Sequence, residues 1–178
     1  KDSMSRISHN ALAQAIATVR AMDMKQKEQL ADELFRAQPH LLGSFLVQKQ
    51  LGVSVEKMDF LIDLLLICFQ AMKESGLTWP VITEDELDRQ LQRHIAIVKF
   101  GDDLGKSLRD QSMRQYIEDH PEKELLAYVQ AETANWLNRI VPEETDKYVM
   151  MAAANFVNCI AFVPMDAPES APCRRQTG

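Results

Sequence analysis

Glycine is scarce in this chain of 178 residues: only six occur, and few stand in turn pairs such as Asn-Gly. Because tight β-hairpins depend on such pairs, the sequence argues against a hairpin-rich β protein. The hydrophobic fraction of 46% and the charged fraction of 26% lie near the averages of globular domains, which excludes the collagen-like and disordered classes. The length allows one domain with a core of its own.

The chain also lacks a basic segment. Lys and Arg number 20 against 26 Asp and Glu, which gives a net charge of −6, and the acidic residues are spread along the chain rather than run together. Nucleic acids and anionic membranes are bound by concentrated positive charge. We therefore expect neither a nucleic acid nor a membrane among the partners, and we interpret the acidic residues as solvated faces of helices.

Cysteine is rare and widely spaced, at Cys68, Cys159 and Cys173, with no C-x-x-C pair. This spacing excludes a disulfide framework and a zinc knuckle, and it favours a reducing compartment. The first 25 residues lack the apolar region of a signal peptide. The longest nearly uninterrupted apolar stretch, residues 60–69, contains Asp63 and has about half of the ~20 residues that a membrane span needs. We expect a soluble, cytoplasmic protein.

Caps, prolines and apolar spacing predict an all-α, single-domain bundle of about eight helices. Asp23, Ser54 and Thr83 are the predicted caps of three of them. In the second helix we expect Leu30, Leu34 and Phe35 to point inward. The predicted ranges are 5–22, 23–37, 39–50, 55–75, 83–100, 103–118, 121–140 and about 143–163. We assign residues 4–163 to the helical domain and 164–178 to an extended, proline-rich C-terminal tail.

Two of these segments, about 55–75 and 143–163, are apolar almost all round and are therefore predicted to be central. A helix of this kind is either surrounded by its own domain or covered by a partner, so two in one short chain favour self-association. An alternative architecture is a short α-solenoid of helical hairpins, because Pro39, Pro80 and Pro121 are spaced by 41 residues each. The residues that follow these prolines agree little with one another.

The segment Leu51-Gly52-Val53-Ser54 resembles the turn of a helix-turn-helix DNA reader. The residues at the apolar positions of that motif are Val47, Leu51, Met58 and Leu61. The sequence departs from the motif at Gln48, where two helices need a small residue in order to touch. The second helix would also present carboxylates to the DNA phosphates. We interpret the turn as a helix C-cap followed by a Ser N-cap, with DNA binding as a distant third function.

Acidic residues form two groups at helical spacing. The first is Glu56, Asp59 and Asp63, and the second is Glu84 or Asp85 together with Asp88. If two such helices faced each other, their carboxylates could hold Mg²⁺ against phosphates, as in all-α nucleotide pyrophosphohydrolases, although the Glu-Glu-x-x-Glu run of that family is absent. Exposure to solvent is the interpretation we prefer for Asp59 and Asp63. A Mg²⁺-dependent phosphohydrolase, or a small-ligand pocket on these faces, is thus the alternative function.

The sequence contains no recognisable catalytic, phosphate-binding or metal-binding motif. We therefore predict a non-enzymatic module for protein–protein interaction or regulation, which binds itself as a homodimer or larger assembly, or another protein, without a cofactor. The loop at Trp79 and Pro80 is the predicted partner contact, because an exposed tryptophan is a common binding hot spot. Packing of this ring over the ends of the neighbouring helices is the more frequent alternative.

Overall fold

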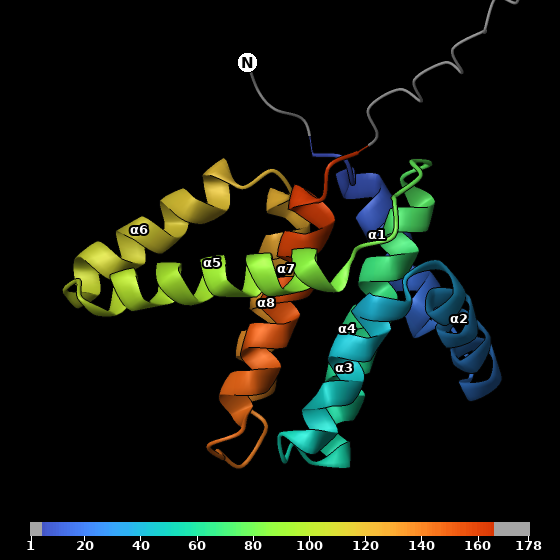
Figure 1. Ribbon diagram of the computed structural model, residues 1–178, viewed down its shortest axis with the longest axis horizontal. Helices are drawn as coiled ribbons and strands as arrows, with labels where there is room; N and C mark the ends of the chain where they lie inside the picture. Colours follow the sequence, from blue (N-terminus) through green and yellow to red (C-terminus); the bar gives the residue numbers. More distant parts are fainter. Residues whose placement is uncertain (1–4, 166–178) are drawn as a thin grey trace, which may run out of the picture.

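The computed structural model describes residues 5–165, which form eight α-helices and no β-strand (Figure 1). The helices are α1 His9–Arg20, α2 Met24–Ala37, α3 Pro39–Gln50, α4 Val55–Glu74, α5 Glu84–Asp102, α6 Lys106–Asp119, α7 Lys123–Leu137 and α8 Asp146–Phe162. The predicted all-α class and single-domain bundle are confirmed. No helix in residues 5–165 has the length and apolarity needed to cross a membrane. The predicted tail, 164–178, lies almost wholly outside the described residues.

Local capping chemistry sets the helix starts. The side chains of Asp23, Ser54 and Thr83 each accept a hydrogen bond from the backbone N–H three residues on, as predicted. Ser8 caps α1 in the same way, so this helix starts later than predicted. At the other end of α3, the chain turns at Gly52 with a φ of +90°, a conformation that favours glycine.

The core lies around α4 and α8, which pack against each other. α1 packs on α4, and α7 and α5 pack on α8, so helices far apart in the sequence are neighbours in space. A solenoid would instead place each hairpin mainly against the next one along the chain. Leu65 on α4 and Phe156 on α8 are almost completely buried. The prediction that these two helices are central is therefore confirmed.

The prediction for Phe35 is wrong. Its side chain is 61% exposed, whereas Leu30 and Leu34 are buried as expected. Successive residues on a helix point about 100° apart, so the residue after Leu34 turns away from the narrow buried stripe of α2.

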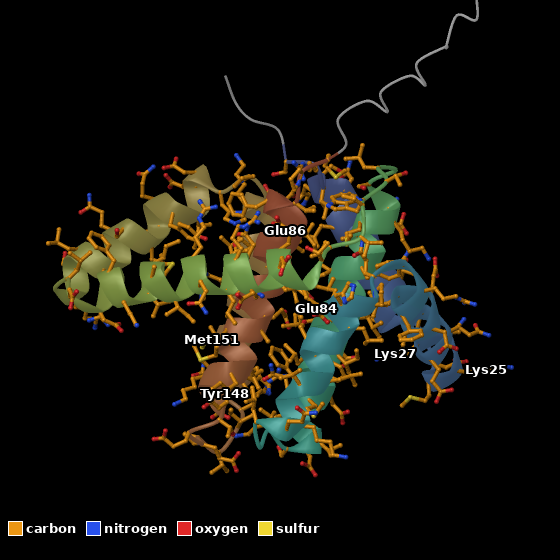
Figure 2. All side chains as sticks on the ribbon, viewed as in Figure 1. Lys25, Lys27, Glu84, Glu86, Tyr148 and Met151 are labelled. Atoms are coloured by element: carbon orange, nitrogen blue, oxygen red, sulfur yellow. The ribbon has the colours of Figure 1, made fainter. Side chains whose placement is uncertain are left out.

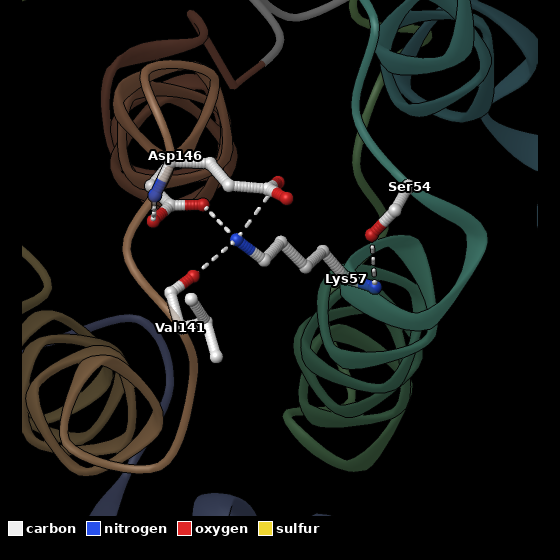
Figure 3. A network of polar contacts seen from close by, with 5 residues as sticks. Ser54, Lys57, Val141 and Asp146 are labelled. Carbon is white, nitrogen blue, oxygen red and sulfur yellow. Dashed lines mark hydrogen bonds and ion pairs between the residues drawn. The ribbon is translucent and has the colours of Figure 1, made fainter.

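A buried ion pair fixes the corner between α3 and α4 against the start of α8 (Figure 3). Lys57 Nζ donates to Asp146 Oδ1 at 2.6 Å, to Glu143 Oε2 at 3.0 Å and to the carbonyl of Val141 at 3.0 Å. Burial lowers the pKa of Lys57, but hydrogen bonds and charges of the two carboxylates outweigh it and raise the pKa above its ordinary value. The same pairing keeps the pKa of Asp146 low against the effect of its burial. Lys57 is therefore buried as a cation with its donors paired.

Candidate binding groove between α3, α5 and α8

The helices α3, α5 and α8 pack against one another around a surface groove. One part has a volume of about 420 Å³ and an adjoining part has about 110 Å³, with three residues lining both. Figure 2 shows Glu84 at the start of α5, and Tyr148 and Met151 on α8. We define the α3–α8 groove by its lining residues: Pro39, His40, Gly43, Ser44, Val47, Gln48, Leu51, Glu84, Leu87, Asp88, Leu91, Tyr148, Met151, Ala152 and Asn155.

On α3 the usual distribution of polar and apolar side chains is reversed at the groove. Val47 is 44% exposed and Leu51 at the helix end is 42% exposed, whereas Gln48 between them is only 6% exposed. Apolar side chains gain free energy when they leave water, and a buried amide loses it unless it is hydrogen-bonded. This stretch of α3 therefore leaves apolar side chains in water while it buries an amide, and both features are unfavourable for the isolated chain.

Two buried carboxamide oxygens at the groove have no hydrogen-bond partner among the described residues: Gln48 Oε1 and Asn155 Oδ1. Asn155 Nδ2 donates to the carbonyl of Leu87 at 3.2 Å, which fixes the orientation of this amide. The free atom of Asn155 is therefore an acceptor. A ligand that supplies an N–H or O–H donor would pair it, and buried polar groups in native proteins are nearly always paired.

Two further unpartnered atoms, Gln90 Oε1 and His94 Nδ1, belong to the same helix α5 but do not line the groove. Burial lowers the pKa of His94, so its ring is neutral at physiological pH. All four unpartnered buried side-chain atoms of residues 5–165 thus lie on the three helices that form the groove.

The electrostatic character of the groove is acidic. Glu84 and Asp88, both on α5, are its only carboxylates, and no Lys or Arg lines it. His40 Nδ1 lies 3.5 Å from Glu84 Oε1, and the side chain of Glu84 remains 84% exposed. Asp88 is also exposed. An occupant that carries a positive charge beside apolar groups would match this surface.

The predicted acidic residues do not form one site. Asp59 and Asp63 line a depression of about 330 Å³ between α2 and α4, where Lys27 Nζ lies 3.1 Å from Asp63 Oδ1. Glu56 and Asp85 are exposed and line none of these hollows, and Asp88 lines the α3–α8 groove. Within residues 5–165, no group of three or more His, Cys, Asp or Glu side chains could hold a metal ion.

The loop at Trp79 and Pro80 is tied to the body of the protein. Trp79 is half-buried, and its Nε1 donates to the carbonyl of Ile160 at 3.0 Å. The carbonyl of Pro80 accepts from Gln38 Nε2 at 2.8 Å. The indole N–H, which would be the polar handle of a binding hot spot, is thus already paired within the chain.

The segment that resembles a helix-turn-helix is built differently from that motif. Val47 and Leu51, which the motif would bury, are exposed, and Gln48, where it needs a small residue, is buried. The helix that would enter DNA is α4, and most of its length is inside the protein core. The interpretation as a C-cap followed by a Ser54 N-cap agrees with this geometry.

A second buried polar cluster, which the sequence did not indicate, lies around Glu122 and His120. Glu122 is inaccessible to solvent, and its carboxylate accepts the backbone N–H of Arg6 at 2.8 Å and of Ile7 at 3.3 Å. His120 Nδ1 accepts the Glu122 N–H at 3.0 Å, and its Nε2 lies 2.9 Å from Asn158 Oδ1. This cluster joins Arg6 and Ile7, which precede α1, to α8.

Sequence reasoning missed the groove because its residues come from three separate helices. The signals that could have pointed to it are a glutamine among the apolar residues of 41–51 and an asparagine in the most apolar part of 146–162. Comparison with known protein families, with curated proteins and with solved structures finds no match to this chain.

Proposed function

We propose that this chain is a non-enzymatic interaction module whose α3–α8 groove binds a short segment of another protein, apolar on one side and carrying Lys or Arg. The observation that supports it most directly is the reversed pattern of α3, which exposes Val47 and Leu51 and buries an unpaired Gln48. A bound helix would cover the first two and could supply donors to the third. Recognition of this kind is the helix-in-groove mode.

The preference for a basic segment follows from the charge of the groove. Glu84 and Asp88 stand at its α5 side with no Lys or Arg among the lining residues. Carboxylates at the rim of an interface steer a cationic partner and reject an anionic one. The same contacts are screened by salt, so binding should weaken as ionic strength rises.

Two synthetic amphipathic peptides test this proposal. Both have the same leucine face, and the polar face is all Lys in one and all Glu in the other. With fluorescence anisotropy, we expect the Lys peptide to bind the full chain and the Glu peptide to bind at least tenfold more weakly. Equal affinity for both peptides would contradict the proposal.

Matched variants locate the binding surface. Asp88→Asn removes a groove carboxylate, whereas Asp85→Asn removes an exposed one on the same helix outside the groove. Val47→Asn and Leu46→Asn are the corresponding apolar pair, because Leu46 is 55% exposed but does not line the groove. We expect weaker binding of the Lys peptide from the groove member of each pair only. Equal losses within both pairs would place the binding surface elsewhere.

The size of the groove supports a second candidate, a small apolar amine. Its larger part, of about 420 Å³, falls within the roughly 300–1,000 Å³ typical of small-molecule sites. Native mass spectrometry of the purified chain separates the two. A retained mass of a few hundred daltons that Asn155→Leu abolishes would favour the small ligand.

A further inference from the structure

The two parts of the α3–α8 groove differ in chemistry. Both carboxylates of the groove, Glu84 and Asp88, line its larger part, and neither lines the smaller one. The smaller part has a volume of about 110 Å³, and the described residues along it include no Asp, Glu, His, Lys or Arg. Its polar lining residues are Ser44, Gln48, Tyr148 and Asn155, and the others are apolar. We call this smaller part the neutral pocket.

The neutral pocket contains two acceptors that are not hydrogen-bonded within residues 5–165. These are Gln48 Oε1 and Asn155 Oδ1, and each of the two residues is only 6% exposed. The hydroxyl of Ser44, one turn before Gln48 on α3, does not pair them because it donates to the carbonyl of Leu41 at 2.7 Å. An occupant that pairs both oxygens must therefore carry two N–H or O–H donors.

A charged group does not suit the neutral pocket. Elsewhere in this chain a buried cation, Lys57, is met by the carboxylates of Glu143 and Asp146. An ammonium or guanidinium group in the neutral pocket would lose its hydration with no carboxylate to replace it, which is unfavourable. A carboxylate has only acceptors and would face two further oxygens. The occupant is therefore uncharged.

A primary carboxamide meets both requirements. It is uncharged, and its NH₂ group supplies two donors while its carbonyl accepts. The amide of Gln48 carries N–H donors beside its oxygen, so it can also donate to the carbonyl of the occupant. The volume fits as well: at roughly 30 Å³ for each water-sized group, the pocket of about 110 Å³ holds about four non-hydrogen atoms, as in an asparagine side chain.

We propose that the neutral pocket binds an asparagine or glutamine side chain of the segment that occupies the α3–α8 groove. One N–H of its carboxamide donates to Gln48 Oε1 and the other donates to Asn155 Oδ1. The basic residues of the same segment lie at Glu84 and Asp88, in the larger part of the groove. This inference rests on the function proposed for the groove and adds the side chain that the groove prefers.

A peptide series tests this preference with the full chain. Each leucine of the Lys peptide is replaced in turn by glutamine and, at the same position, by methionine, glutamate or lysine. At one position we expect glutamine to bind at least tenfold more tightly than methionine, since pairing a buried oxygen accounts for about a factor of ten. Glutamate and lysine should bind more weakly than glutamine there. If glutamine gives no advantage at any position, the inference is overturned, even when the all-leucine Lys peptide binds and the proposed function stands.

Variants of the chain assign the preference to the two amides. Gln48→Met and Asn155→Leu should each reduce the advantage of glutamine over methionine, and the double variant should abolish it. Gln50→Met, at an exposed position on the same helix as Gln48, should leave the advantage unchanged. An advantage that is also unchanged in Gln48→Met and Asn155→Leu overturns the inference. Circular dichroism shows that each variant remains folded.

A small amide probes the neutral pocket without a peptide. In heteronuclear NMR spectra of the full chain, propionamide should shift the side-chain NH₂ signals of Gln48 and Asn155. Propylammonium and propionate, which are of similar size but charged, should not shift them. Failure of the Lys peptide to bind contradicts the proposed function, whereas the absence of propionamide shifts, or equal shifts from propylammonium, contradicts the assignment of the neutral pocket.

Discussion

Replacing Gln48 by methionine should stabilise this protein. The glutamine is 6% exposed, and its Oε1 has no partner among the described residues. A buried polar group that stays unpaired costs about 1–3 kcal/mol, and methionine fills a similar volume without that cost. We therefore expect Gln48→Met to raise the free energy of unfolding by about 1–3 kcal/mol, a rise in Tm of about 2–4 °C for each kcal/mol in a chain of this size.

Urea unfolding followed by circular dichroism measures this change. The control is Gln50→Met, which makes the same substitution at an exposed position two residues away on α3 and should change stability by no more than about 0.5 kcal/mol. Equal m-values would show that the two proteins unfold from comparable states. If Gln48→Met is no more stable than Gln50→Met, the amide is not the unpaired group described above and the argument for a donor-bearing occupant is refuted. The same variant should also bind the Lys peptide less well.

Two other regions give predictions of stability. Burial lowers the pKa of His120 from its ordinary value of 6.5, and the Glu122 N–H donates to His120 Nδ1. The folded state therefore takes up a proton at His120 less readily than the unfolded state does. The contribution of the neutral ring to the free energy of unfolding is fully present above about pH 6.5 and is lost as the pH falls through the lowered pKa. Urea titrations near pH 7.5 and pH 5.5 should show a smaller loss in His120→Gln, and an equal loss in both proteins would argue against this role. Trp79→Phe removes the hydrogen bond to the carbonyl of Ile160, so the free energy of unfolding should fall by about 0.5–1.5 kcal/mol, and no change in the same assay would mean that the bond is not formed in solution.

The parts of the fold that depend on neighbouring residues were predictable from the sequence. Asp23, Ser54 and Thr83 cap helices because a side-chain oxygen reaches a backbone N–H three residues on, whatever the rest of the chain does. The central place of α4 and α8 was predictable for a similar reason. A helix without a polar face has no side that it can turn to water.

Features that depend on long-range contacts were not predictable. The ion pair of Lys57 and Asp146 joins residues 89 positions apart, and nothing near either residue indicates the other. The indole N–H of Trp79 is paired because the carbonyl of Ile160, in the last turn of α8, lies beside it. This contact depends on the tertiary structure. The groove was not predictable for the same reason, since Gln48, Asp88 and Asn155 come from three different helices.

The unpaired amides of Gln48 and Asn155 contrast with two buried ionisable groups elsewhere in the protein, which are hydrogen-bonded. Lys57 and Glu122 carry ionisable groups into the interior, and each is met by two or more hydrogen-bond partners. The fold can thus satisfy demanding groups over long sequence distances. At Gln48 and Asn155, beside a groove with exposed apolar side chains, it leaves an oxygen free. A fold that pairs a buried carboxylate but not these amides retains the free-energy cost of the unpaired oxygens, which a bound donor would remove. For this reason we place the binding surface at the α3–α8 groove rather than at the acidic face of α4.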